Sequence, residues 1–211
     1  MTTLLLLRHG TSVNNTERRF SGQFDTPLTE QGRLQAAEAG EYILKSFPVT
    51  AVYASDLTRA RDTVTPVAQA LGLPVTLDPA LREVDLGDFT NQPIKEYKAL
   101  HEEIYRAFRT ENKRLPKGEC WGDVTERAWK AFQRIAAAHP NETVLVGTHG
   151  GVIRALQTLW QGKDPSQIDT TPEPTNASLT VIDCEKMWRL CSSFSTWSSQ
   201  LLASRRMTSQ R

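Results

Sequence analysis

The sequence predicts an α/β fold in which helices flank a mostly parallel central sheet. Short apolar runs alternate along the chain with segments whose apolar residues recur at helical spacing. Two of the apolar runs end in a histidine followed by glycine, as expected where parallel strands end at a ligand site. A length of 211 residues, 39% of them hydrophobic, suits one domain with its own core.

The first part of the chain alternates strand and helix patterns. Thr29 supplies an N-cap oxygen at the start of one helix, and Pro66 could bend another. The predicted elements are a strand at 3–7, a helix at 30–45, a strand at 51–54, a helix at 57–71 and a strand at 75–77.

The second part contains an insertion and then returns to the α/β pattern. A helical period rich in Lys, Glu and Tyr is broken by Pro116 and Gly118, so we interpret 92–118 as an insertion at one edge of the domain. The expected elements after it are a helix at 119–139, a strand at 143–146, a helix at 151–160 and an antiparallel pair at 179–183 and 188–194. We therefore expect one domain over 1–195 and a polar, flexible tail at 196–211.

The composition excludes several classes of protein. Lys+Arg is 25 and Asp+Glu is 24, which argues against nucleic acid or a membrane surface as a partner. The cysteines Cys120, Cys184 and Cys191 have no metal-ligand spacing, so neither a disulfide framework nor a zinc site is expected. Since the chain shows neither a signal-peptide pattern nor a membrane-span pattern, we expect a cytoplasmic protein.

The two His-Gly pairs are the strongest chemical signal. His9 follows a run of leucines and Arg8, and His149 follows an apolar run that ends in Gly-Thr. Glycine at such a strand end lets the backbone approach an anion. For either histidine alone, an ordinary turn residue is an equally good interpretation. Arg8 and Arg59 favour a phosphoryl site, because a guanidinium grips two oxygens and keeps its charge, whereas Arg61 fits a solvent-facing helix position.

These residues belong to a longer series that resembles the histidine phosphatase superfamily, in its phosphoglycerate-mutase-like branch. The resemblance implies a three-layer α/β sandwich with a mostly parallel sheet. It covers about residues 3–182 through motifs in family order: Leu7-Arg8-His9-Gly10; Asn15, Arg19-Phe20-Ser21-Gly22 and 27–32; Tyr53-Ala54-Ser55 with Arg59-Ala60; Leu81-Arg82-Glu83 with Gly87; Gly118-Glu119 with Asp123 and Arg127; and His149-Gly150-Gly151.

The resemblance also implies roles for individual residues. His9 would be the nucleophile that becomes phosphohistidine, and Glu83 would protonate the leaving group and then activate water. A salt bridge between Glu83 and Arg82 is the alternative for that carboxylate. The residues implied to hold the phosphoryl group are Arg8, Arg59 and His149, with substrate contacts from Asn15, Ser21, Gly22 and Gly150. No metal and no cofactor is implied.

The departures from the mutase pattern favour a phosphatase acting on a small phosphate ester. Val84-Asp85-Leu86-Gly87 replaces the mutases' Arg-His-Tyr-Gly, and Gln23 stands where they have tryptophan. Thr11 and Thr90-Asn91 depart from many relatives and predict an unusual substrate pocket. A mutase and a catalytically weak phospho-ligand-binding protein remain alternatives.

Candidates for reading the substrate lie in the insertion, although most of them are expected to be the solvated face of a helix instead. They are Lys95, Tyr97, Lys98, Tyr105, Arg109, Lys113 and Arg114. The sequence leaves open the substrate itself, the oligomeric state (a homodimer is one option), residual mutase activity and the role of the tail.

Overall fold

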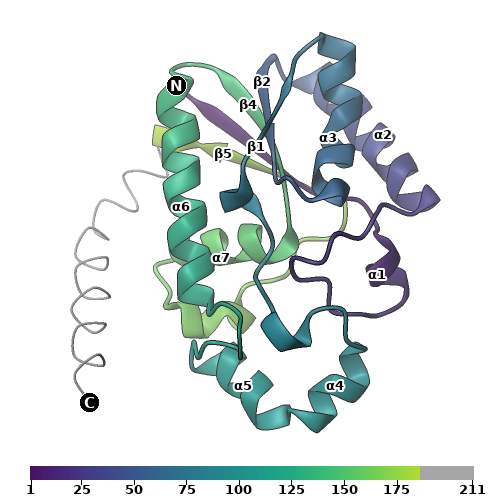
Figure 1. Cartoon of the computed structure of the whole chain (residues 1–211). Coiled ribbons are helices and arrows are strands. Elements are labelled where there is room, and N and C mark those ends of the chain that lie inside the picture. The colour runs from purple at the N-terminus through teal and green to yellow at the C-terminus, as the bar shows by residue number, and fades with distance from the viewer. Residues whose placement is uncertain (186–211) are drawn as a thin grey trace.

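The computed structural model describes residues 1–185 and contains a five-stranded sheet between two layers of helices (Figure 1). The strands β1 to β4 are parallel, and β5 runs antiparallel to β1. In the spatial order of the sheet they are β3 (Val75–Leu77), β2 (Val49–Ala54), β4 (Thr143–Thr148), β1 (Thr3–Arg8) and β5 (Leu179–Asp183). The predicted three-layer α/β fold with a mostly parallel sheet is confirmed.

The strand predicted at 179–183 is present, and its neighbour in the sheet is β1. The partner predicted for it at 188–194 lies outside the described residues, as does the tail at 196–211. None of the helices within residues 1–185 combines the length and apolar character that a membrane crossing requires.

The leucine run of β1 is continuous because both faces of the strand are buried. Leu4 and Leu6 belong to the core that the sheet shares with α6 (Trp121–Ala138) and α7 (Gly150–Trp160). Leu5 and Leu7 belong to the core on the other face, beneath α2 (Glu30–Ser46) and α3 (Thr58–Leu71). Successive side chains of a strand point to opposite faces, so an interior strand between two helical layers has no polar positions.

The helix boundaries follow capping signals in the sequence. The hydroxyl of Thr29 accepts a hydrogen bond from the backbone N–H of Gly32 at 3.0 Å, which confirms Thr29 as the N-cap of α2. Pro66 lies inside α3, which ends at Gly72 in the left-handed conformation (φ 64°). The short helix α1 (Val13–Thr16), which the sequence did not predict, follows the loop after β1.

The segment 92–118, which we predict to be an insertion, contains two helices, α4 (Ile94–Leu100) and α5 (Glu102–Thr110). They lie at the end of the molecule toward which β1 and β4 run (Figure 1). Short 3-10 helices occur at Pro79–Leu81, Gly87–Phe89 and Pro165–Thr170. The carboxyl ends of β1 and β4 therefore face the segment that contains α4 and α5.

Candidate active site

The two strand-end histidines lie side by side because their strands are neighbours in register. Arg8 of β1 is paired with Thr148 of β4, and the backbone N–H of His9 donates to the carbonyl of Thr148 at 3.0 Å. The ring centroids of His9 and His149 are 5.2 Å apart, and the two residues are 3% and 0% exposed. The sheet thus brings together two rings that are far apart in the sequence.

The ring of His9 is held in the form that a nucleophile needs. Its Nδ1 lies 2.7 Å from the carbonyl oxygen of Gly10. Since a carbonyl can only accept, Nδ1 carries the proton and Nε2 keeps its lone pair. Burial, and then the charges of Arg59 and Arg8, lower the pKa of His9 well below its ordinary value of 6.5. The imidazole is therefore neutral at pH 7.

Arg59 brings a buried positive charge to these rings from the first turn of α3. Asp25 accepts from the backbone N–H and the hydroxyl of Thr58, which fixes the start of that helix. The guanidinium donates to the carbonyls of Gly22 and Phe24, both at 2.8 Å. Burial lowers the pKa of Arg59 to about 10, and the side chain remains charged at neutral pH.

Arg8 enters from the end of β1. It forms an ion pair with Glu173 at 3.1 Å and donates to the carbonyl of Pro174. Its guanidinium packs against the first residue of α7, since a Cβ on Gly150 would lie 2.9 Å from the Arg8 Cζ. Any larger residue at Gly150 would displace the guanidinium of Arg8. The substrate contact expected of Gly150 stays a prediction.

Three nitrogens around His9 are buried and have no partner within the described residues. They are Nε of Arg8, Nε of Arg59 and Nδ1 of His149. Both arginine charges also lower the pKa of His149, after the larger effect of burial, which indicates that these groups lie close together. Buried polar groups are rarely left without a hydrogen bond. An anion with several oxygens beside His9 would supply the acceptors that are missing.

The carboxylate of Glu83, from the segment after the 3-10 helix Pro79–Leu81, lies against the start of α7. Its Oε1 accepts from the backbone N–H of Val84 at 2.9 Å and its Oε2 from that of Gly151 at 3.2 Å. A Cβ on Gly151 would come within 2.2 Å of Oε1, so this approach requires glycine. The alternative salt bridge is not formed, because Arg82 pairs with Asp56, with 2.7 Å from its Nε to Oδ1.

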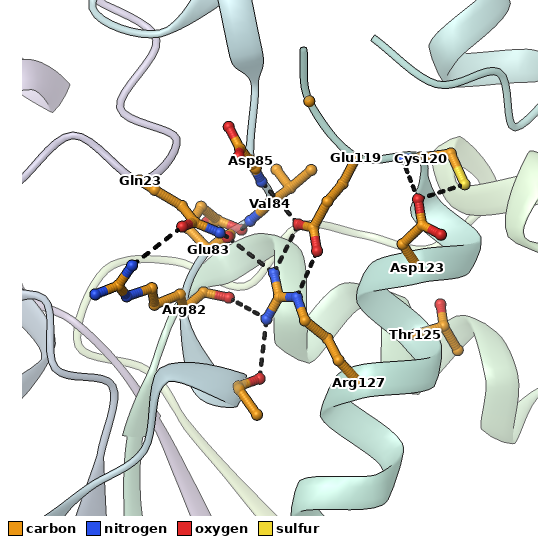
Figure 2. A network of polar contacts seen from close by, with 12 residues as sticks. Gln23, Arg82, Glu83, Val84, Asp85, Glu119, Cys120, Asp123, Thr125 and Arg127 are labelled. Atoms are coloured by element: carbon orange, nitrogen blue, oxygen red, sulfur yellow. Dashed lines mark hydrogen bonds and ion pairs between the residues drawn. The ribbon is translucent and has the colours of Figure 1, made fainter.

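The segment that carries Glu83 is held by Arg127 of α6 (Figure 2). Its guanidinium is paired through two nitrogens with both carboxylate oxygens of Glu119, at 2.7 and 2.9 Å. The remaining bonds of the guanidinium go to three backbone carbonyls, those of Ala80, Arg82 and Glu83, at 2.7–2.9 Å. The resemblance picked out Glu119 and Arg127 without a role, and the structure shows that they fix the backbone on either side of Arg82.

The other predicted substrate contacts have structural partners of their own. Gly22 adopts a positive φ of 48° and gives its carbonyl to Arg59. The carbonyl of Ser21 accepts from the N–H of Phe24 at 2.9 Å. The side-chain oxygen of Asn15 accepts from the backbone and hydroxyl of Ser12, both at 3.0 Å. The substrate contacts of these residues therefore remain predictions.

Several insertion side chains that we expected either to read a substrate or to face solvent have partners within residues 1–185, and one of them, Arg114, also faces solvent. Arg109 pairs with Asp169, and Arg114 pairs with Asp123 at 2.6 Å. Nζ of Lys98 lies 4.4 Å from the ring centroid of Tyr105. Tyr97 and Tyr105 both pack against Phe89, Tyr97 with 4.8 Å between the ring centroids. Lys95 and Lys113 are exposed, as expected of a solvated helix face.

Sequence analysis assigned no contact within the site to three residues that the structure places there, although the resemblance had named Ser55 and Gln23. The hydroxyl of Ser55 lies 2.9 Å from Nε2 of His149. Asn176 donates to the carbonyl of His9 at 3.1 Å, and Gln23 donates to the carbonyl of Glu83 at 3.2 Å. Ser55 directly follows β2, so the rule that identified the two histidines could have found it. Asn176 and Gln23 lie in loops without such a signal.

Within residues 1–185, no three His, Cys, Asp or Glu side chains gather closely enough to hold a metal ion. The geometry instead joins a neutral imidazole, two guanidinium groups, a second imidazole and a carboxylate. This set can bind a phosphoryl group and attack it.

Comparison with known proteins identifies the family. The family model of the histidine phosphatase superfamily (branch 1) matches residues 4–194. The chain is 32% identical to the probable phosphoglycerate mutase GpmB of Erwinia tasmaniensis over 87% of this chain and 85% of that protein. It is 33% identical to the metal-independent phosphoserine phosphatase of Arabidopsis thaliana over 86% of this chain and 76% of that protein.

A solved structure agrees with the sequence matches. The mycobacterial glucosyl-3-phosphoglycerate phosphatase in complex with VO3 superposes with a TM-score of 0.78 at 32% identity, covering 86% of this chain and 92% of that one. The chain is an enzyme that belongs to the histidine phosphatase superfamily.

Proposed function

We propose that the chain is a metal-independent phosphomonoesterase that acts through a phosphohistidine on a small phosphorylated metabolite in the cytoplasm. The observation that carries this proposal is the set of unpartnered buried nitrogens on Arg8, Arg59 and His149 around the neutral ring of His9. A phosphoryl group is the ligand whose several oxygens match these positions and whose phosphorus would face Nε2.

The reaction follows from the positions of these groups. Nε2 of His9 attacks phosphorus, the N–P bond forms and the P–O ester bond breaks, leaving its electron pair on the alkoxide. Glu83 gives that oxygen a proton. A water then gives a proton back to Glu83 as its oxygen attacks phosphorus, and the N–P bond breaks to release inorganic phosphate and neutral His9. Arg8 and Arg59 hold the phosphoryl oxygens throughout.

Metal independence is supported by the two guanidinium charges, which do the work that a divalent cation does elsewhere. Phosphatase rather than mutase activity is favoured by Gln23, which bonds to the carbonyl of Glu83 where the mutases have tryptophan. The relatives include both proteins named as mutases and proteins named as phosphatases. A mutase is therefore the second candidate. The third candidate is a binding protein without turnover. The intact nucleophile, carboxylate and phosphoryl site argue against it.

A panel of phosphate monoesters separates the three candidates. Sugar phosphates, phosphoglycerate derivatives and nucleotide-like monophosphates such as ribazole phosphate are each scored by kcat/KM, with and without excess EDTA. The phosphatase releases inorganic phosphate from at least one class, and EDTA leaves the rate unchanged. Isomerisation of monophosphoglycerate that needs a bisphosphate primer identifies a mutase. Binding without turnover, or loss of activity that Mg²⁺ restores, contradicts the proposal.

A further inference from the structure

The hydrogen bonds of Ser55 restrict the protonation of His149. Ser55 is fully buried at the end of β2, and its backbone N–H donates to the carbonyl of Gly147 in β4 at 2.9 Å. This pairing puts its hydroxyl 2.9 Å from Nε2 of His149. The same oxygen accepts from the backbone N–H of Leu57 at 3.3 Å. The question is which atom of the Ser55–His149 pair carries the shared proton.

Two arrangements are possible, and they differ in how many buried groups are satisfied. If Nε2 of His149 donated, the oxygen of Ser55 would accept twice and its own proton would have no acceptor within the described residues. If Ser55 donates, its oxygen accepts once and donates once, and Nε2 is satisfied as an acceptor. The second arrangement leaves one buried group unmet, Nδ1–H of His149, whereas the first leaves two, the proton of Ser55 and the bare Nδ1, so the second is favoured.

We infer that Ser55 is a positioning residue which holds His149 in the tautomer with its proton on Nδ1, so that His149 presents an N–H donor to the phosphoryl group. This inference rests on the proposed function. Nδ1 is the ring nitrogen that is buried without a partner, and the side chain does not cap α7. In the other tautomer Nδ1 would present a lone pair to an anion and repel it.

The two histidines are thus held in the same tautomer but present opposite ends to the site. His9 donates through Nδ1 to Gly10 and offers a bare Nε2. His149 accepts at Nε2 from Ser55 and offers Nδ1–H. The difference lies in which ring nitrogen is engaged, Nδ1 by a carbonyl in His9 and Nε2 by a hydroxyl in His149, so the contact made by each ring decides its role.

The tautomer can be measured directly by NMR of protein labelled with ¹⁵N-histidine, because the chain has only four histidines. Protonated and bare ring nitrogens resonate far apart, and His9→Ala and His149→Gln assign the signals. We expect His149 to be protonated on Nδ1 in the free protein, and its signal to move when inorganic phosphate is added. His139, which is bonded to Tyr53 and Glu142 away from this site, is the internal control. A proton on Nε2 of His149 overturns the inference.

Two variants test the consequence for catalysis. Ser55→Ala should lower kcat/KM by about 10- to 100-fold, as loss of a partner that fixes a ring tautomer does elsewhere, and should give a mixture of His149 tautomers. Ser55→Thr keeps the hydroxyl and should restore much of the rate. Thr158→Val, which removes a buried hydroxyl from the helix that follows His149, should leave both readouts unchanged. An unchanged tautomer and rate in Ser55→Ala overturn the inference.

The tautomer is read in the protein without substrate, so failure of the inference and failure of the proposed function are distinguishable. If no phosphate ester is hydrolysed but His149 carries its proton on Nδ1, the proposed function fails and the role of Ser55 stands. If esters are hydrolysed and the proton is on Nε2, the role of Ser55 fails alone.

Discussion

The rings of His9 and His149 lie 5.2 Å apart at an angle of 60°, each at the end of one of two hydrogen-bonded parallel strands. Both rings are buried beside Arg59, so a proton on either one would add a positive charge to an enclosed site that already holds another. This relationship keeps both rings neutral and makes the chemistry of the site sensitive to each neighbour that fixes a ring proton.

Replacement of His9 tests the covalent route. In His9→Ala the nucleophile is gone, so kcat should fall by at least about 10³-fold, or roughly 4 kcal/mol of barrier. Substrate labelled in its phosphoryl group is turned over and quenched in base or in acid. The parent should carry label on the protein that survives base and is lost in acid, and the variant should carry none. The fold should survive, because His9 ends its strand and faces the site. Labelled phosphate on a serine instead would rule out the assignment of His9.

Glu83→Gln tests the general acid by comparing leaving groups. An alkyl phosphate leaves as a strongly basic alkoxide and needs the proton, so its kcat/KM should fall by about 10²- to 10⁴-fold. A nitrophenyl phosphate leaves as a stable anion and should lose much less. Because Arg82 is paired with Asp56, the exchange breaks no ion pair of Arg82 and should change the melting temperature little. Equal losses on the two substrates would refute the acid role.

The two buried histidines predict a pH dependence of stability. The pKa of each is lowered below 6.5 in the folded chain, so below that pH the unfolded chain binds protons that the folded one does not. Stability therefore falls as pH drops through about 6.5, by up to about 1.4 kcal/mol per pH unit for each ring, until the folded pKa values are reached.

Urea unfolding between about pH 7 and about pH 5 measures this slope. His9→Gln and His149→Gln should each reduce the slope by the equivalent of about one proton taken up on unfolding, and the double variant by about two. If neither substitution changes the slope, the two rings bind protons equally in the folded and unfolded chains, and the prediction is wrong.

Arg127→Met tests the support of the segment around Glu83. The change removes the ion pair with Glu119 and the hydrogen bonds from Arg127 to three carbonyls, and should cost about 2–4 kcal/mol of unfolding free energy. Arg134→Met is the matched control on the same helix: Arg134 pairs with Asp78 and its side chain is 61% exposed, so about 0–1 kcal/mol is expected. Chemical denaturation compares the two variants, and equal losses of unfolding free energy would contradict the role of Arg127.

In Arg127→Met, activity on alkyl phosphates should fall more than on nitrophenyl phosphates, because Glu83 loses its fixed position.

The sequence by itself determined the layers of the fold and the edge at which the chemistry occurs. Apolar periods report whether a segment is buried on one face or two, which is how the strand at 3–7 and the helix at 30–45 could be predicted. Parallel strands end at a common edge of the sheet, so the sequence alone predicts that His9 and His149 lie close together.

The tertiary structure alone decided which partner each polar side chain takes. Arg82 bonds to Asp56 rather than to the adjacent Glu83, and Arg127 closes around carbonyls that lie more than forty positions away. Ser55 meets His149 across 94 positions. Sequence periodicity reflects neighbours within one or two turns, whereas these contacts depend on strand register and helix placement to within a hydrogen-bond length. Such distances are fixed only when the whole core has packed.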